Sequence, residues 1–296
     1  HILMRYYTTP SVKEARESVT WSLFFIFLLY FTAPALAVLV KFEVFSVLVG
    51  TPFDKLPAWI ANWSKVDAAL LSVTDINKDG ILQLNEFFMR PDIVVLATPE
   101  IAGLPYVISG LVAAGGLAAA LSTAAGLLLA ISSAISHDLF KNIFMPDMSE
   151  KNELMTGKIA MACSIMVAGY LGLNPPDFAA GTVAIAFGLA ASSIFPALMM
   201  GIFNKKMNKE GAMAGMLAGI GVTMLYVFAH KGLFFIKGTE FLGLFGGKAN
   251  FFMGIEPNAF GAIGALVNFG VAYVVSKMTP ACPPEVTALV ESVRVP

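Results

Sequence analysis

The chain has 296 residues with a formal net charge of −1, and 57% of them are hydrophobic while only 13% are charged. A soluble domain carries about 25% charged residues. The composition therefore excludes an ordinary soluble domain and predicts a polytopic membrane protein. The near-zero charge also lacks the basic footprint of a nucleic-acid-binding protein, so no nucleic-acid partner is expected.

The predicted architecture is all-α, with about six helices that cross the membrane. A basic segment, residues 1–18, is expected to precede the first of them. A tail at 280–296 is expected to follow the last and to lie in the cytoplasm. The chain begins with His rather than Met, and we expect it to be part of something longer. The predicted spans are approximately residues 19–40, 105–136, 159–173, 178–203, 211–229 and 257–276.

The distribution of lysine predicts the orientation of the spans. The loops at 137–158 and 204–210 carry three lysines each, whereas the turn at 174–177 between them carries none. Positively charged loops stay in the cytoplasm, so both ends of the chain are expected inside and residues 41–104 outside. Lysines in the 230–255 loop count against this orientation.

The external segment at 41–104 contains a calcium-loop pattern, DINKDGILQLNE at residues 75–86. In the EF-hand template, side-chain or main-chain oxygens at fixed positions hold the ion and a glycine permits the sharp turn. An amphipathic helix over about 57–74 is expected to lead into the loop. The alternative is an acidic turn that only mimics the pattern. The predicted ligands are Asp75, Asn77, Asp79, the Ile81 carbonyl, Gln83 through water, and Glu86.

The span at 105–136 has no charged residue and an unusual density of Gly, Ala, Ser and Thr, which let neighbouring backbones approach closely. Within it lie two adjacent hydroxyls, Ser122 and Thr123. Neutral hydroxyls and backbone carbonyls suit a hard cation without burying a carboxylate. The alternative is that both hydroxyls bond back to their own helix or join two helices.

The later spans offer weaker signals. Ser192 and Ser193 are the local candidates for a substrate pathway, and helix packing is the alternative role for them. Glycines at 211, 215 and 219 predict a packing groove. No nucleophile, base or metal constellation lies at membrane depth, so an enzyme is not expected.

Three stretches together resemble bacterial members of the sodium:solute symporter family, in particular its acetate-permease-like branch, over residues 1–277. The opening HILMRYYTTPSVKEAR resembles the loop before a late helix of these proteins. The ALST pair and the closing SSAISHDLF resemble the family's sodium helix. The stretch FGLAASSIFPALMMGIFNKKMNKEGAMAGMLAG is similar to the two helices that follow. The external calcium-loop insert looks like a subgroup feature.

The resemblance implies a LeuT-type bundle of inverted repeats in the bacterial inner membrane. It implies a sodium site made by the hydroxyls of Ser122 and Thr123 and the carbonyl of Ala119, completed by the N-terminal half of the same transporter. The implied function is sodium-coupled symport of a small organic anion, a monocarboxylate such as acetate. Na⁺ is the expected coupling ion. Ca²⁺ is a further ion that the external loop is expected to bind, and membrane lipid is expected to surround the helices. The alternatives are a symporter-like membrane sensor and a calcium-binding accessory membrane protein.

Overall fold

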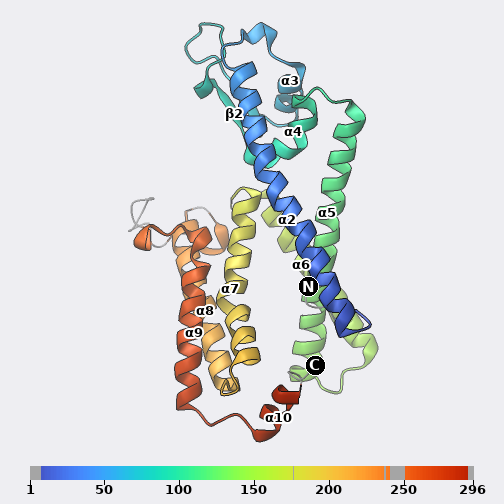
Figure 1. The fold of residues 1–296 in the computed structure, drawn as a ribbon, viewed down its shortest axis with the longest axis vertical. Helices are drawn as coiled ribbons and strands as arrows, with labels where there is room; N and C mark the ends of the chain where they lie inside the picture. Colours follow the sequence, from blue (N-terminus) through green and yellow to red (C-terminus); the bar gives the residue numbers. More distant parts are fainter. Residues whose placement is uncertain (1–7, 176, 237, 241–250, 293–296) are drawn as a thin grey trace. The chain divides into compact units, whose positions relative to one another are not determined.

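The computed structural model describes residues 8–175, 177–236, 238–240 and 251–292. They form two compact units divided after Leu173 (Figure 1). Among the described residues, six helices are long and apolar enough to cross a membrane, which confirms the predicted all-α polytopic membrane architecture. Parts of the predicted lead-in and tail, and two lysines of the 230–255 loop, lie outside the described residues.

The long helices of the N-terminal unit extend beyond the predicted spans. Helix α2 (Val12–Glu43) begins at the N-cap Ser11, whose hydroxyl accepts a hydrogen bond from the Glu14 N–H. It continues as a π-helix to Leu48. Hydropathy marks only the apolar part of a helix, whereas backbone hydrogen bonding continues through its polar ends. The other two are α5 (Tyr106–Ser133), which continues as a π-helix to Phe144, and α6 (Glu150–Leu173).

A small polar subdomain connects α2 to α5 (Figure 1). Its core contains the fully buried side chains of Ile60, Leu71 and Leu82. An antiparallel hairpin crosses it, with Leu71 opposite Met89. The elements are α3 (Ala58–Val66), β1 (Leu71–Val73), β2 (Phe87–Met89) and α4 (Val94–Ile101).

The helix predicted over about 57–74 is therefore wrong in its second half. Helix α3 ends at Val66, and residues 71–73 form a strand. The calcium-loop pattern at 75–86 is followed by β2. The segment is thus a loop between two paired strands, and the expectation that a helix leads directly into it is wrong. Short apolar runs are compatible with either helix or strand, and cross-strand pairing decides between them here.

The C-terminal unit is a bundle in which α9 packs against both α7 and α8 (Figure 1). Asn208, the N-cap of α8, accepts a hydrogen bond from the Gly211 N–H and donates to the Thr279 hydroxyl at 2.7 Å. The start of α8 is thereby tied to the end of α9. The helices are α7 (Ala179–Phe203), α8 (Lys209–Lys231), α9 (Gly261–Met278) and the short α10 (Pro284–Ser292).

The predicted glycine groove on α8 is confirmed. Gly211, Gly215 and Gly219 are all buried. A Cβ atom at Gly219 would lie 2.1 Å from the Ser192 carbonyl oxygen and 2.8 Å from the Gly264 carbonyl oxygen. Both are backbone atoms of neighbouring helices, so they cannot move aside as a flexible side chain could. Close approach of the three backbones thus requires glycine at this position.

We expect Gly219→Ala to destabilise the C-terminal unit, because the added methyl group would force α8 away from α7 and α9. Overpacking of this kind costs about 1–3 kcal/mol. The matched control is Gly221→Ala on the same helix, where an added Cβ meets nothing within 4 Å. Thermal unfolding of the detergent-solubilised protein should show a lower midpoint for the first variant only. Equal midpoints would contradict the groove.

Candidate functional site

The hydroxyls of Ser122 and Thr123 lie on an exposed part of α5. Within the described residues, neither hydroxyl has a hydrogen-bond partner. Several hydroxyls on other long helices instead bond back to a carbonyl of their own helix. Thr32 donates to the Leu28 carbonyl, for example, and Thr223 donates to the Gly219 carbonyl at 2.9 Å. The usual bond back to the preceding turn is therefore not formed by this pair, and both oxygens are free for another partner.

Ala119 lies one turn before the two hydroxyls. Side chains three and four residues further along a helix lean back over the preceding turn. Ser122 and Thr123 follow Ala119 by three and four residues, so the three positions share one side of α5. A hard cation takes about six oxygen ligands, so three oxygens from α5 would supply only part of a cation site and would need others to complete it.

Ser192 and Ser193 have a different environment. Both are buried in α7, and both hydroxyls donate to the Leu189 carbonyl, at 3.0 and 2.7 Å. Their own carbonyls accept hydrogen bonds from the side chain of Asn268 on α9, each at 2.8 Å. These contacts indicate that Ser192 and Ser193 take part in helix packing. A role in the substrate pathway stays a prediction.

Asn268 is the buried polar residue that our reading of the sequence missed. Its side chain is fully buried, and its Nδ2 group bridges the two α7 carbonyls. Its Oδ1 atom is buried with no hydrogen-bond partner among the described residues. A single asparagine within an apolar span was the available signal, because such residues hydrogen-bond across helices in membranes.

A second polar cluster lies at one end of the C-terminal bundle. Asp177 precedes α7, and its Oδ2 atom accepts hydrogen bonds from Lys231 at 2.5 Å and Asn258 at 3.1 Å. Partial burial raises the pKa of Asp177, but the bonds from Lys231, from Asn258 and from the Phe178 N–H outweigh it, and the pKa is lowered. The pair joins the start of α7 to the end of α8.

The carboxylates of the loop at 75–86 accept hydrogen bonds from groups within the loop itself. Glu86 is buried and accepts hydrogen bonds from the N–H groups of Ile76 and Gln83, at 2.8 and 2.9 Å. Asp75 accepts one from the Gly80 N–H through Oδ2. The other oxygen of Asp75 is buried and has no partner among the described residues.

The remaining predicted ligands form turns along the same loop. Asp79 accepts hydrogen bonds from the Ile81 N–H and from the Asn77 and Gln83 side chains, at 2.8, 2.8 and 2.9 Å. These bonds lower its pKa, with the Ile81 N–H as the main cause. Within the described part of the chain, no group of three or more His, Cys, Asp or Glu residues is arranged to hold a metal ion. As observed, the oxygens serve mainly as acceptors within the loop.

Among the described residues, the six helices that are long and apolar enough to cross a membrane define a polytopic membrane protein. Residues 93–219 match the model of the sodium:solute symporter family. An uncharacterized symporter of Cupriavidus necator is 49% identical over 294 residues, which are 99% of this chain and 42% of that protein. These matches confirm the predicted resemblance to the sodium:solute symporter family and indicate a transporter rather than an enzyme.

The chain spans about two fifths (42%) of the length of this curated relative. No solved structure matches the chain.

We expect Asp177→Asn to lower the free energy of unfolding by about 1–2 kcal/mol at pH 7, a value between those of exposed and buried ion pairs. Because the folded-state pKa of Asp177 is lowered, its contribution is present above the unfolded pKa of about 3.9. It is lost as the pH falls through the folded-state pKa. Thermal unfolding at several pH values should show the difference from wild type shrinking below about pH 4.

The control is Asp147→Asn, which removes an exposed carboxylate of the N-terminal unit. It should leave the unfolding midpoint unchanged at each pH. A loss of stability in Asp177→Asn that is the same at pH 7 and in acid would contradict the role of the carboxylate charge.

Proposed function

We propose that the full-length protein carrying this chain is a sodium-coupled symporter of the cell membrane. The matches to the sodium:solute symporter family support the transport class. The observation that carries the proposal for sodium is the pair of partnerless hydroxyls on α5. Most membrane hydroxyls are satisfied by their own helix, so two adjacent free ones favour a ligand from elsewhere.

In the proposed mechanism, Na⁺ binds the hydroxyls of Ser122 and Thr123 and the carbonyl of Ala119. The N-terminal half of the same transporter supplies the other oxygens. The ion joins α5 to that half and stabilises the outward-open state. A ligand shifts a conformational equilibrium only through its different affinities for the two states. Loss of sodium to the cytoplasm then favours the inward-open state and release of the substrate.

The proposed substrate is a small organic anion, a monocarboxylate such as acetate, as the acetate-permease-like resemblance implies. Ser192 and Ser193 stay the local candidates for lining its pathway. In the proposed orientation the loop at 41–104 faces outward and both ends of the chain face the cytoplasm, in a bacterial inner membrane. The exposed apolar side chains along α2 and α5 would face lipid or the N-terminal half.

We also propose that the loop at 75–86 binds Ca²⁺. Two features support it: one oxygen of Asp75 is buried without a partner, and Gly80 has the positive φ of 73° that the sharp turn of such loops uses. Binding would require the Glu86 carboxylate to share its oxygens with the ion. For an isolated external loop, we expect a dissociation constant on the order of 10⁻⁴–10⁻³ M.

The sodium site is tested by replacing Ser122 and Thr123 together with alanine in the full-length protein. We expect sodium-driven uptake of labelled acetate into proteoliposomes to fall at least about tenfold at low sodium. The reason is that two of the roughly six oxygens around a hard cation are lost. A higher sodium concentration for half-maximal uptake would be the specific signature.

The matched control is Ser133→Ala, which removes an exposed hydroxyl near the end of the same helix. It should transport like wild type. Uptake that does not depend on sodium, or a double variant with unchanged sodium dependence, would refute the ion site. A sodium dependence with another small solute, but not with acetate, would refute only the substrate.

The calcium proposal is tested with Asp75→Asn. Millimolar Ca²⁺ should raise the thermal unfolding midpoint of the wild-type protein, because a ligand that binds the folded state stabilises it. The rise should be lost in the variant. The control Asp54→Asn changes an exposed carboxylate outside the loop and should keep the rise. No calcium effect on wild type would leave the loop as a hydrogen-bonded turn.

A further inference from the structure

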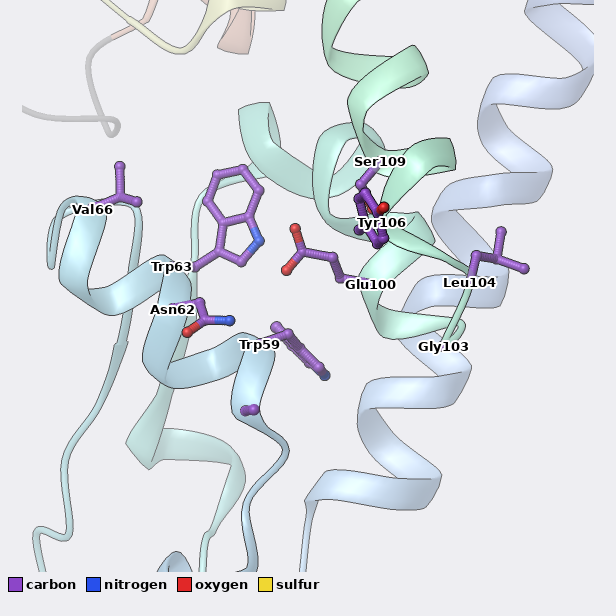
Figure 2. Close-up of a pocket in the computed structure, with 10 residues that line it drawn as sticks. Trp59, Asn62, Trp63, Val66, Glu100, Gly103, Leu104, Tyr106 and Ser109 are labelled. Atoms are coloured by element: carbon purple, nitrogen blue, oxygen red, sulfur yellow. The ribbon is translucent and has the colours of Figure 1, made fainter.

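A cavity of about 640 Å³ opens between α3, α4 and the start of α5, all within the N-terminal unit (Figure 2). Its volume falls in the range of small-molecule sites, about 300–1,000 Å³. Trp59 and Trp63 come from α3, Glu100 from α4, and Tyr106 and Ser109 from α5. These residues are distant in sequence, and folding of the small subdomain brings them together.

Two of the aromatic side chains are held firmly. Trp59 and Trp63 are four residues apart on α3 and so lie on one face of the helix. Trp59 is buried in the core of the subdomain, and Trp63 packs against that core. Tyr106, the first residue of α5, adds a largely exposed ring at the rim. The faces of these rings carry negative electrostatic potential, which attracts cations.

Glu100 supplies the charge of the cavity. Figure 2 shows its side chain extending from α4 toward α3, with the carboxylate directed toward Trp63. Within the described part of the chain, this carboxylate has no hydrogen-bond or ion-pair partner. No lysine or arginine is among the described residues that line the cavity. An anion would therefore be repelled, whereas a cation would meet both an opposite charge and aromatic faces.

The cavity also holds an unused polar group. The Ser109 hydroxyl is buried and has no hydrogen-bond partner among the described residues. Asn62 adds an amide at the edge. An ammonium group needs acceptors for its hydrogens or, when methylated, apolar contact with rings. The cavity offers both kinds of contact.

From these contacts we infer that the cavity between α3, α4 and α5 binds an alkylammonium group, held by the Glu100 carboxylate and the rings of Trp59, Trp63 and Tyr106. The site is separate from the proposed sodium site, since Tyr106 and Ser122 are about 24 Å apart along α5 at 1.5 Å per residue. The group belongs either to a free amine or to the headgroup of a membrane lipid. Both sources share the chemistry that the cavity recognises.

The test uses the full-length protein in detergent and isothermal titration with two probes. One is choline, and the other is 3,3-dimethylbutanol, which has the same shape without the charge. We expect choline to bind and the neutral probe to bind at least about tenfold more weakly. Equal affinity for the two probes, or no choline binding, would overturn the inference.

Two substitutions then assign the contacts. Glu100→Gln keeps the shape and removes the charge, and should weaken choline binding about tenfold; Trp63→Leu should weaken it about fivefold or more, while Trp63→Phe keeps a ring and most of the affinity. The control Asp54→Asn removes an exposed carboxylate outside the cavity and should bind choline like wild type. Unchanged affinity in Glu100→Gln would overturn the inference.

A second arm identifies the source of the ammonium group. The protein is reconstituted in nanodiscs of phosphatidylethanolamine or of phosphatidylglycerol, and choline is titrated into each. Weaker choline binding in phosphatidylethanolamine indicates that lipid headgroups compete for the site. Equal choline binding in both membranes indicates a free amine. Choline binding in neither membrane would overturn the inference.

Discussion

The bilayer requires each polar group of a spanning helix to find a partner within the protein, and the arrangement of this chain depends on that requirement. Hydroxyls on α7 and α8 bond to carbonyls of their own helices. The buried side chain of Asn268 on α9 reaches α7 and donates hydrogen bonds to two of its carbonyls at once. The hydroxyls of Ser122 and Thr123 on α5 form no such bond among the described residues.

Close packing in the C-terminal unit follows from the same constraint. Lipid tails are as apolar as leucine, so helices associate through contact of their backbones and through hydrogen bonds rather than through the hydrophobic effect. Gly219 lets the carbonyl of Ser192 approach α8, and Gly264 of α9 lies against the same point. The approach in turn places Asn268 within reach of α7. Glycine spacing and the asparagine bridge are thus two parts of one interface.

Much of the fold could be predicted because its signals are local. Six apolar segments and the glycine repeat at 211, 215 and 219 are visible in the sequence and are confirmed in the structure. The helix predicted over about 57–74 was wrong in its second half because Leu71–Val73 is too short for its periodicity to decide between helix and strand. Its pairing partner lies beyond the loop, so tertiary contacts settle the outcome.

The candidate sites also differ in whether local sequence alone could reveal them. Ser122, Thr123 and Ala119 could be named in advance, because they lie within one turn of one helix and the family resemblance assigns their roles. The exposure of the two hydroxyls and their lack of partners required the structure. The cavity around Glu100 could not be predicted, since Trp63, Glu100 and Ser109 come from three separate elements. Asn268 could have been flagged as a lone amide in an apolar span, although its bridge to Ser192 could not.

The proposed sodium site on α5 has a consequence for how transport would be coupled to the ion. Three oxygens on a single rigid helix bind a hard cation weakly, because the remainder of its coordination shell must come from water or from another element. In the proposed mechanism, the affinity for sodium would depend on how closely that other element approaches α5. A conformation that brings it near would bind sodium and one that withdraws it would release sodium, so that ion occupancy and conformation would be linked by differential affinity. Because the hydroxyls of α5 would supply only part of the coordination shell, the proposed site would bind sodium in one conformation and release it in the other.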